Sequence, residues 1–398
     1  MSNIVNAERV HIGIFGLRNA GKSSLINSIT GQNLAIVSDT PGTTTDPVKK
    51  SMELLPIGPV VLIDTPGLDD EGELGILRIN KAKQVLNYID LAIIVKDIER
   101  PMLKNEREVV KLVENKKVPY IVVYNKIDRL NPMNELILED NEYAVSTKTG
   151  EGIENLKEAI GKILKKEDEK RIVQDLVNEG DTVMLVIPID AGAPKGRIIL
   201  PQQQVLRELI DKNVTTVVAN PENLSTTLDK LKSKPNLVIT DSQVFGKVDK
   251  LIPEEVLLTS FSILFARYKG NLESLLSGVK GLDKLKDGST VLISEGCTHH
   301  RQCEDIGTVK MPKWIKEYTE KDINFEFTSG GEFPEDISKY DLIVHCGGCM
   351  INAREMHYRL EQSKDQNVPI TNYGMIIAKM HGILDRSIKP FKDMEKYL

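Results

Sequence analysis

Short apolar runs alternate with amphipathic stretches along residues 10–165 of the chain. Apolar positions three and four residues apart predict helices over residues 23–29, 104–115 and 153–164. The apolar runs between them predict strands at residues 10–16, 60–64, 91–97, 120–125 and 143–146. Strands that alternate with helices predict a mostly parallel sheet with helices on both faces.

The same alternation occurs twice more in the rest of the chain. Strands are expected at residues 182–187, 215–219 and 237–240, with helices at 202–212 and 224–233. A third group has strands at 291–294, 342–345 and 368–372, and helices at 261–268, 353–362 and around 375–384. We therefore predict three α/β domains, over residues 1–170, 176–258 and 260–398. The small middle domain is a candidate for self-association.

Composition narrows the class of protein. The 398 residues carry 52 Lys and Arg against 58 Asp and Glu, and the net charge of −6 gives no basic footprint for nucleic acid. With 40% apolar residues the chain can bury sizeable cores. No stretch approaches the roughly 18–20 apolar residues of a membrane-spanning helix. The N-terminus lacks the basic and apolar regions of a secretory signal, so we expect a cytoplasmic protein without a membrane partner.

A phosphate-binding motif lies where the first strand passes into the first helix. Residues 16–23 read GLRNAGKS and match the pattern GxxxxGK[ST] in the strand-to-helix context that the motif requires. Gly16, Ala20, Gly21 and Ser24 belong to the expected backbone cradle for the phosphates. Lys22 supplies a positive charge to the β- and γ-phosphates, and the Ser23 hydroxyl binds Mg²⁺.

Four further motifs typical of a GTPase follow along the chain. Asp64 opens the sequence DTPG, where it can hold the Mg²⁺ shell while the Gly67 N–H senses the γ-phosphate. Thr44, in a GTT sequence, can complete that shell. The carboxylate of Asp128 can accept two hydrogen bonds from guanine that adenine cannot offer, so it selects GTP. The base pocket is completed by Asn125, Lys126, Ser146, Thr147 and Lys148.

This motif set resembles the translation-factor-like GTPases, including the Era and MnmE-like families. The resemblance implies a Ras-like P-loop fold that binds GTP or GDP with Mg²⁺. Leu68 occupies the position after Gly67, where Ras-like enzymes carry a water-positioning Gln, so we expect slow hydrolysis. Asn19 is similar to the asparagine that coordinates K⁺ in potassium-activated relatives, so we expect K⁺ to stimulate turnover. The residues expected to act in hydrolysis are Lys22, Asn19, Thr44 and Gly67.

All four cysteines lie in the last third of the chain. Cys297 precedes Thr298 and His299, and Cys346 and Cys349 form a C-x-x-C sequence directly after His345. Both groups follow predicted strands, so they should meet at the carboxyl ends of those strands. Thiolates bind zinc or iron–sulfur clusters. Zinc could take all four cysteines, Cys303 included, whereas a 4Fe–4S cluster could use Cys297, Cys346 and Cys349.

The arrangement Cys-x-His followed by His-Cys-x-x-Cys resembles the GTPase scaffold proteins of [FeFe]-hydrogenase maturation, the HydF family. The resemblance covers the whole chain: a GTPase domain, a small α/β dimerisation domain and an α/β cluster-binding domain. It implies a 4Fe–4S cluster held by Cys297, Cys346 and Cys349. It also implies a homodimer, with a higher oligomer as a further option. The implied task is to receive a transient diiron precursor from radical-SAM maturases and deliver it to apo-[FeFe]-hydrogenase.

The fourth ligand of such a cluster stays open in the sequence. His299 and His345 match the family motif, and Glu304 and Asp305 offer carboxylate oxygens on the segment after Cys297. We rank Glu304, His345 and His299 as near equals and expect Cys303 to be a bystander.

Two other functions fit parts of the pattern. A GTPase of ribosome or tRNA maturation with a C-terminal zinc-binding domain would also combine these motifs. A redox enzyme using the cluster would need a second cofactor motif, and the sequence contains neither such a motif nor the radical-SAM pattern CxxxCxxC.

Overall fold

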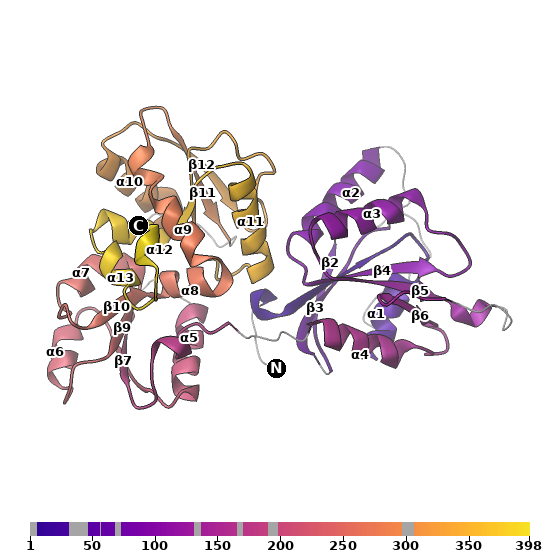
Figure 1. Cartoon of the computed structure of the whole chain (residues 1–398), viewed down its shortest axis with the longest axis horizontal. Coiled ribbons are helices and arrows are strands. Elements are labelled where there is room, and N and C mark those ends of the chain that lie inside the picture. The colour runs from indigo at the N-terminus through magenta and orange to yellow at the C-terminus, as the bar shows by residue number, and fades with distance from the viewer. Residues whose placement is uncertain are drawn as a thin grey trace. The chain divides into compact units, whose positions relative to one another are not determined.

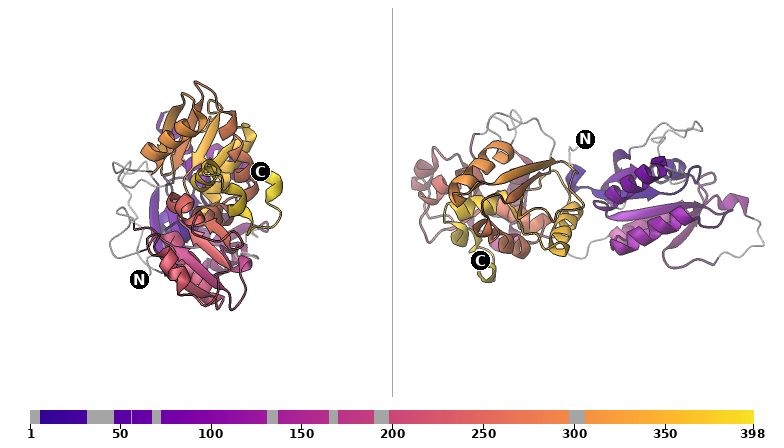
Figure 2. Two further views of the ribbon diagram at one scale, coloured as in Figure 1. Left: turned by 90° about the vertical axis from the view of Figure 1, so that its left-hand side faces the viewer. Right: turned by 90° about the horizontal axis from the view of Figure 1, so that it is seen from above.

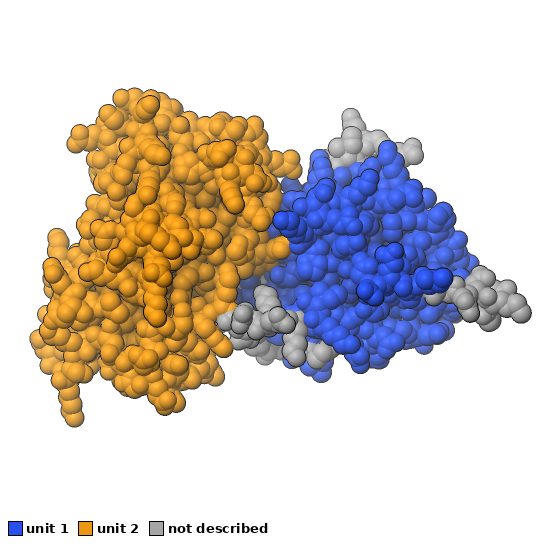
Figure 3. Space-filling model, viewed as in Figure 1, with its two compact units in different colours: residues 1–169 blue, residues 170–398 orange. Residues whose placement is uncertain are grey.

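The computed structural model describes residues 6–31, 47–55, 57–67, 73–130, 137–164, 170–189, 198–296 and 306–398. The chain divides into two compact units, residues 1–169 and residues 170–398 (Figures 1 and 3). We call them unit 1 and unit 2 and describe each by itself.

Unit 1 contains a six-stranded sheet in the order β2-β3-β1-β4-β5-β6 (Figure 1). Only the pair β2–β3 is antiparallel. The strands are β1 (Val10–Phe15), β2 (Val48–Leu54), β3 (Gly58–Asp64), β4 (Leu91–Asp97), β5 (Tyr120–Asn125) and β6 (Glu142–Val145). The helices are α1 (Lys22–Thr30), α2 (Glu73–Leu86), α3 (Lys104–Asn115) and α4 (Ile153–Leu164).

Both faces of this sheet are covered, as the alternation of apolar runs and amphipathic helices predicts. Leu25 of α1 and Leu156 of α4 belong to one core, and Val85 of α2 and Val109 of α3 belong to the other. Burial on both faces explains why a central strand such as β4 is apolar along nearly its whole length. The predicted α/β fold, with helices on both faces of a mostly parallel sheet, is confirmed for this unit.

Unit 2 contains two four-stranded parallel sheets (Figures 1 and 2). The first, in the order β10-β9-β7-β8, has strands β7 (Thr182–Val186), β8 (Thr215–Ala219), β9 (Leu237–Thr240) and β10 (Leu257–Ser260). The second, in the order β12-β11-β13-β14, has strands β11 (Thr290–Glu295), β12 (Asn324–Ser329), β13 (Leu342–His345) and β14 (Ile370–Asn372).

The helices of unit 2 join the two sheets through a common core. One hydrophobic cluster runs from Ile172 to Phe391 and includes residues of both sheets, such as Leu185 and Ile343. A second cluster packs Met311 and Ile376 against the other face of the second sheet. The helices are α5 (Leu200–Asp211), α6 (Leu224–Asp229), α7 (Phe245–Asp249), α8 (Phe261–Lys269), α9 (Leu272–Val279), α10 (Met311–Thr319), α11 (Ala353–Asp365), α12 (Tyr373–Met380) and α13 (Leu384–Ile388).

Several boundaries in unit 2 differ from the sequence prediction, among them the following three. Helix α6 ends at Asp229 rather than at residue 233. Strand β14 begins at Ile370, directly after a proline that cannot donate to the ladder. The expected last helix is divided into α12 and α13, because Gly382 between them has a φ of 70° and interrupts the helical path. Among the described residues, no helix has both the length and the apolar character needed to cross a membrane.

Candidate functional site

The phosphate loop, residues 16–23, joins the end of β1 to the start of α1. Gly16 has a φ of 147°, and a Cβ there would lie 2.3 Å from the Val95 carbonyl oxygen. Gly21 has a φ of 97°, and its Cβ would meet the Asn125 amide nitrogen at 2.1 Å. Only glycine fits either position without displacing its neighbours. The Lys22 ammonium lies over the loop and donates to the carbonyl oxygens of Gly16 and Leu17, both at 3.0 Å.

Two of the predicted Mg²⁺ ligands are adjacent in the structure. The Ser23 hydroxyl donates to Asp64 Oδ2 at 3.0 Å. Asp64 Oδ1 is buried, and no described residue donates a hydrogen bond to it. Burial raises the pKa of the Asp64 carboxyl, and the Lys22 charge opposes this effect. A hydroxyl beside a buried acceptor with spare capacity fits a hydrated divalent cation.

The sequence DTPG is anchored to the strand that leads into the phosphate loop. Thr65 donates from its hydroxyl to the Ile14 carbonyl oxygen at 2.7 Å and from its backbone N–H to the same oxygen at 3.2 Å. Gly67 therefore follows a fixed turn at the end of β3. Thr44 and Leu68, to which we assigned a Mg²⁺ contact and slow hydrolysis, lie outside the described residues.

Asn125 connects the base-binding loops to the phosphate loop. Its side chain is fully buried and donates to the Ala20 carbonyl oxygen at 3.0 Å. Its Oδ1 accepts the backbone N–H groups of Lys126 at 2.8 Å and Thr147 at 3.1 Å. One amide thus holds three segments together, which explains why an asparagine with both donor and acceptor groups stands there.

The candidate guanine acceptor is positioned by the loop after β6. Ser146 donates from its hydroxyl to Asp128 Oδ1 at 2.7 Å and accepts the backbone N–H groups of Lys148 and Thr149. This hydrogen bond lowers the pKa of the exposed Asp128 carboxyl, which favours its ionised, accepting form. Lys126 is held at 2.6 Å by Asp97, a partner that the sequence analysis did not identify.

The cysteine loop, residues 346–351, follows β13 in unit 2. Cys346 Sγ accepts the backbone N–H of Gly296 at 3.0 Å and that of Gly348 at 3.4 Å. Because β11 and β13 are parallel neighbours, the segment that leads to Cys297 ends beside Cys346, as predicted for strands that share an edge. Cys297, His299, Cys303, Glu304 and Asp305 lie outside the described residues.

The donor set of this loop fits an anionic metal–sulfur group. Backbone N–H groups that donate to thiolate sulfur are a normal feature of iron–sulfur sites. Helix α11 begins at Ala353, directly after the loop, so its positive end faces the same region. Burial raises the pKa of the Cys346 thiol to about 11. The charge of a bound metal is what would stabilise its thiolate.

A buried network surrounds His345, the last residue of β13. The Arg359 guanidinium is fully buried and donates to His345 Nε2 at 2.8 Å, and also to Ser294 Oγ and the Gly330 carbonyl oxygen. A guanidinium only donates, so Nε2 must be an acceptor and Nδ1 must carry the proton that it donates to the Cys346 carbonyl oxygen at 2.7 Å. Burial and the Arg359 charge lower the pKa of His345 to about 3. Both ring nitrogens of His345 are engaged.

Two buried cations near the cysteine loop were not identified from the sequence. Arg359 is one, and Lys269 of α8 is the other, donating to three carbonyl oxygens of the loop. Arg359 could have been found from helical spacing, because it shares a face of α11 with the apolar Met356 and Leu360. For Lys269, nothing in the neighbouring sequence distinguishes it from a surface lysine at a helix end.

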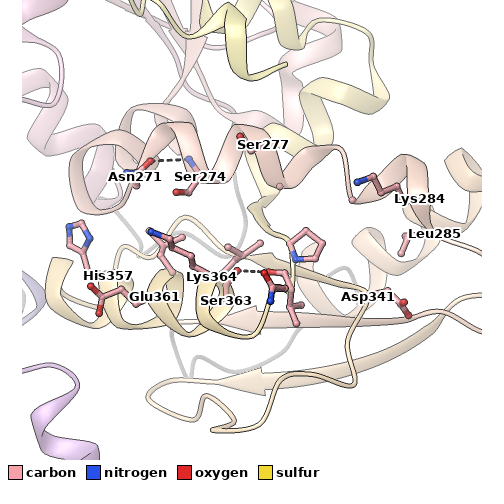
Figure 4. Close-up of a pocket in the computed structure, with 17 residues that line it drawn as sticks. Asn271, Ser274, Ser277, Lys284, Leu285, Asp341, His357, Glu361, Ser363 and Lys364 are labelled. Carbon is pink, nitrogen blue, oxygen red and sulfur yellow. Dashed lines mark hydrogen bonds between the residues drawn. The ribbon is translucent and has the colours of Figure 1, made fainter. Parts of the chain in front are cut away.

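A separate groove of about 810 Å³ lies between α9 and α11 of unit 2 (Figure 4). Figure 4 shows Ser274 of α9 and Asn271, the residue directly before that helix, on one side of it, and His357, Glu361 and Lys364 of α11 on the other. None of the predicted site residues lines this groove.

Comparison with known families divides the chain in the same order. Residues 11–126 match the model of the 50S ribosome-binding GTPase family. Residues 172–270 match the hydrogen maturase F dimerization domain, and residues 273–390 match the hydrogen maturase F tetramerization domain. The last two matches together cover more than half of the chain.

Two curated relatives each match about two fifths of the chain. The tRNA modification GTPase MnmE of Alkaliphilus oremlandii is 33% identical over 159 residues, which cover 38% of this chain and 34% of the relative. The MnmE protein of Legionella pneumophila strain Corby is 38% identical over 161 residues, which cover 39% of this chain and 35% of the relative. The chain thus spans about a third of the length of these relatives.

Solved structures also resemble part of the chain. Aquifex aeolicus Era, in a variant bound to GDP·AlF4⁻, is 20% identical with a TM-score of 0.34, and the match covers 53% of this chain and 92% of that one. The G domain of T. maritima FeoB is 25% identical with a TM-score of 0.32, and the match covers 40% of this chain and all of that one.

Proposed function

Because the chain belongs to the hydrogen maturase F family, we propose that it is a GTP-hydrolysing scaffold that carries a diiron precursor to apo-[FeFe]-hydrogenase. The match of residues 273–390 carries this proposal, since that segment contains the cysteine loop. A GTPase domain precedes it in the same chain. The precursor is cargo, received from radical-SAM maturases.

The proposed resident cofactor is a 4Fe–4S cluster held by Cys297, Cys346 and Cys349. When bound, it would offer one iron without a thiolate ligand to a group that bridges to the cargo. The Gly296 and Gly348 N–H groups orient the Cys346 sulfur toward this role. For the fourth ligand, the engaged nitrogens of His345 favour Glu304 or His299, because His345 would have to give up Arg359 or the Cys346 carbonyl oxygen to bind iron.

In the GTPase domain, the phosphate loop and Lys22 bind the phosphates, and Ser23 and Asp64 hold Mg²⁺. Asp128 selects guanine while Ser146 fixes its carboxylate. We propose slow intrinsic hydrolysis stimulated by K⁺ at Asn19, with Thr44 and Gly67 contacting the γ-phosphate region. The nucleotide state would control association with partner proteins rather than chemistry on the cluster.

We propose that these tasks are divided among three domains, over residues 1–170, 176–258 and 260–398. The protein would act in the cytoplasm. The match of residues 172–270 to a dimerization domain supports a homodimer built on the middle domain, and the following match supports a higher oligomer. The alternative, a ribosome- or tRNA-maturation GTPase with a zinc site, is weaker because the MnmE relatives align with about two fifths of the chain.

Anaerobic reconstitution of the full chain with iron and sulfide tests the cluster. Low-temperature EPR of the dithionite-reduced protein should show a spin-half 4Fe–4S signal, with zinc measured in parallel. Cys346→Ser should abolish the signal, whereas Cys303→Ser, the matched control, should retain it. Stoichiometric zinc without a cluster in the wild type would overturn the proposal and favour the alternative.

A further inference from the structure

Lys269 lies at the end of α8 with only 2% of its surface exposed. Its ammonium donates to the carbonyl oxygens of Gly348 at 3.3 Å, Cys349 at 3.2 Å and Ile351 at 3.0 Å. The donor and the loop are 79 to 82 residues apart in the chain. This contact also joins the two matched segments, because α8 belongs to residues 172–270 and the loop to residues 273–390.

The three hydrogen bonds determine the shape of the cysteine loop. An ammonium has three N–H donors, and three carbonyl groups of one short segment point at it. The loop can curl in this way because Gly348 has a φ of 66°, where a Cβ would meet Met356 Cε at 2.8 Å. Because these carbonyl groups point toward α8, the N–H groups of the loop can donate to sulfur. The Gly348 N–H donates to Cys346 Sγ in this way.

A lysine in this position is not explained by packing alone. Burying an ammonium is costly unless it is well hydrogen-bonded, and Met or Leu would fill the same space without that cost. The Lys269 ammonium also lies 5.9 Å from the centre of the Phe265 ring. A permanent cation held against the cysteine loop fits an anionic group bound by the adjacent cysteines.

We propose that Lys269 is a positioning residue of the cluster site. Its ammonium fixes the loop so that Cys346 and Cys349 face one metal centre, and it places a permanent positive charge behind the thiolates. This inference rests on the proposed function, in which the cysteine loop holds a 4Fe–4S cluster.

The positive charge of Lys269 should affect the midpoint potential of the cluster. One-electron reduction makes a cluster more negative, so a fixed cation nearby favours the reduced form. Removing that cation should lower the midpoint potential, whereas a loss of packing far from the cluster should not. The potential thus separates a positioning cation from a merely structural lysine.

The first test uses the full chain without metal. Amide hydrogen exchange of residues 347–351 should be about tenfold faster in Lys269→Met than in the wild type, because the carbonyl anchors are lost. Lys280→Met, which removes an exposed lysine at the end of α9, should leave the exchange unchanged. This experiment shows whether Lys269 holds the loop, and it needs no bound cluster. A wild-type protein that takes up no cluster would refute the proposed function and not the role of Lys269 in the loop.

The second test is an EPR-monitored redox titration of the reconstituted full chain. At the wild-type midpoint, the ratio of reduced to oxidised cluster in Lys269→Met should fall about tenfold, or about 59 mV for a one-electron couple. Lys269→Gln can still donate to carbonyls but carries no charge. In the Lys269→Gln variant, the loop amides should therefore exchange more slowly than in Lys269→Met, and the midpoint potential should be lowered to a similar extent. If Lys269→Met does not fold, Lys269→Gln still tests the proposal. Wild-type exchange together with a wild-type midpoint in either variant would overturn the proposal.

Discussion

The phosphate loop of unit 1 and the cysteine loop of unit 2 have the same local arrangement. Each follows a strand that is parallel to both of its neighbours and leads toward a helix, and each contains a left-handed glycine, Gly21 or Gly348. In each, a lysine ammonium donates to backbone carbonyl groups. Lys22 contacts two carbonyls of the phosphate loop, and Lys269 contacts three of the cysteine loop.

The two lysines differ in origin and burial. Lys22 belongs to its own loop and is partly exposed, so its ammonium can exchange carbonyl oxygens for the oxygens of a phosphate. Lys269 comes from a distant helix and is buried, so its ammonium stays with the loop. We therefore expect Lys22 to act as a ligand-binding group and Lys269 to act as part of the framework. Changes at the first loop should therefore affect ligand choice, and changes behind the second should affect stability.

The largest effect is expected from Arg359→Met. The variant leaves His345 Nε2, Ser294 Oγ and the Glu355 carboxylate without the guanidinium, and removing one partner of a buried ionic network typically costs about 3–5 kcal/mol. Urea denaturation followed by fluorescence of Trp314, the chain's single tryptophan and a residue of α10 in unit 2, measures the loss. Lys364→Met, at an exposed position of the same helix, is the control. Equal urea midpoints for Arg359→Met and Lys364→Met would show that the buried Arg359 network does not stabilise the unit.

Asp128→Asn should change ligand choice while leaving the fold intact. The amide oxygen can still accept from Ser146, but guanine loses its carboxylate acceptor, so GTP should bind about a hundredfold more weakly, or about 2.7 kcal/mol. Xanthosine triphosphate, which presents a carbonyl in place of the exocyclic amine, should bind better than GTP. Calorimetric titration with both nucleotides checks this, and the exposed Asp140→Asn should behave as the wild type.

Potassium should raise GTP turnover by about tenfold over sodium, equivalent to about 1.4 kcal/mol of barrier. Asn19→Gly should remove this response while permitting the left-handed backbone, since Asn19 has a φ of 59°. Phosphate release in matched KCl and NaCl buffers measures the ratio. Equal rates for the wild type in the two salts would refute the K⁺ site and leave the guanine site untouched.

The smallest effect concerns His11, which unit 1 buries in β1 much as unit 2 buries His345 in β13. Burial lowers the pKa of His11, although Asp90 opposes the shift. The unfolded chain therefore binds a proton near pH 6.5 that the folded chain does not, and stability falls as the pH drops below that value. Between pH 7 and pH 6 the loss is at most about 0.7 kcal/mol.

Hydrogen exchange of the β1 amides at the two pH values, corrected for intrinsic rates, measures this loss. His11→Gln should remove most of the pH dependence. A wild-type profile in that variant would show that other groups account for it.

The sequence predicted the strands best where apolar runs are bounded by site residues. β4 and β5 match their predicted bounds, because each is buried on both faces and ends at a polar residue. β2 and β12 were missed because they lie at sheet edges and carry many exposed polar side chains. Such strands have too little apolar character to be distinguished from loops.

The phosphate and guanine motifs could be predicted because each is a contiguous set of residues with fixed chemistry. Asn125 was assigned to the base pocket, but its bond to Ala20 depends on the approach of two segments 105 residues apart. Lys269 was missed for the same reason, because its partners are backbone carbonyl groups of another element. Such long-range contacts leave no local pattern in the sequence.

Helix α8 has a consequence for how the parts of unit 2 could change during evolution. One end of this helix holds the cysteine loop through Lys269, and Arg267, two residues earlier, binds Asp175 and the Ile172 carbonyl oxygen at the start of the unit. The two family models meet between residues 270 and 273, just beyond the helix. Recombination at that point would separate the loop from its cation. We therefore expect the two segments to be inherited as a pair.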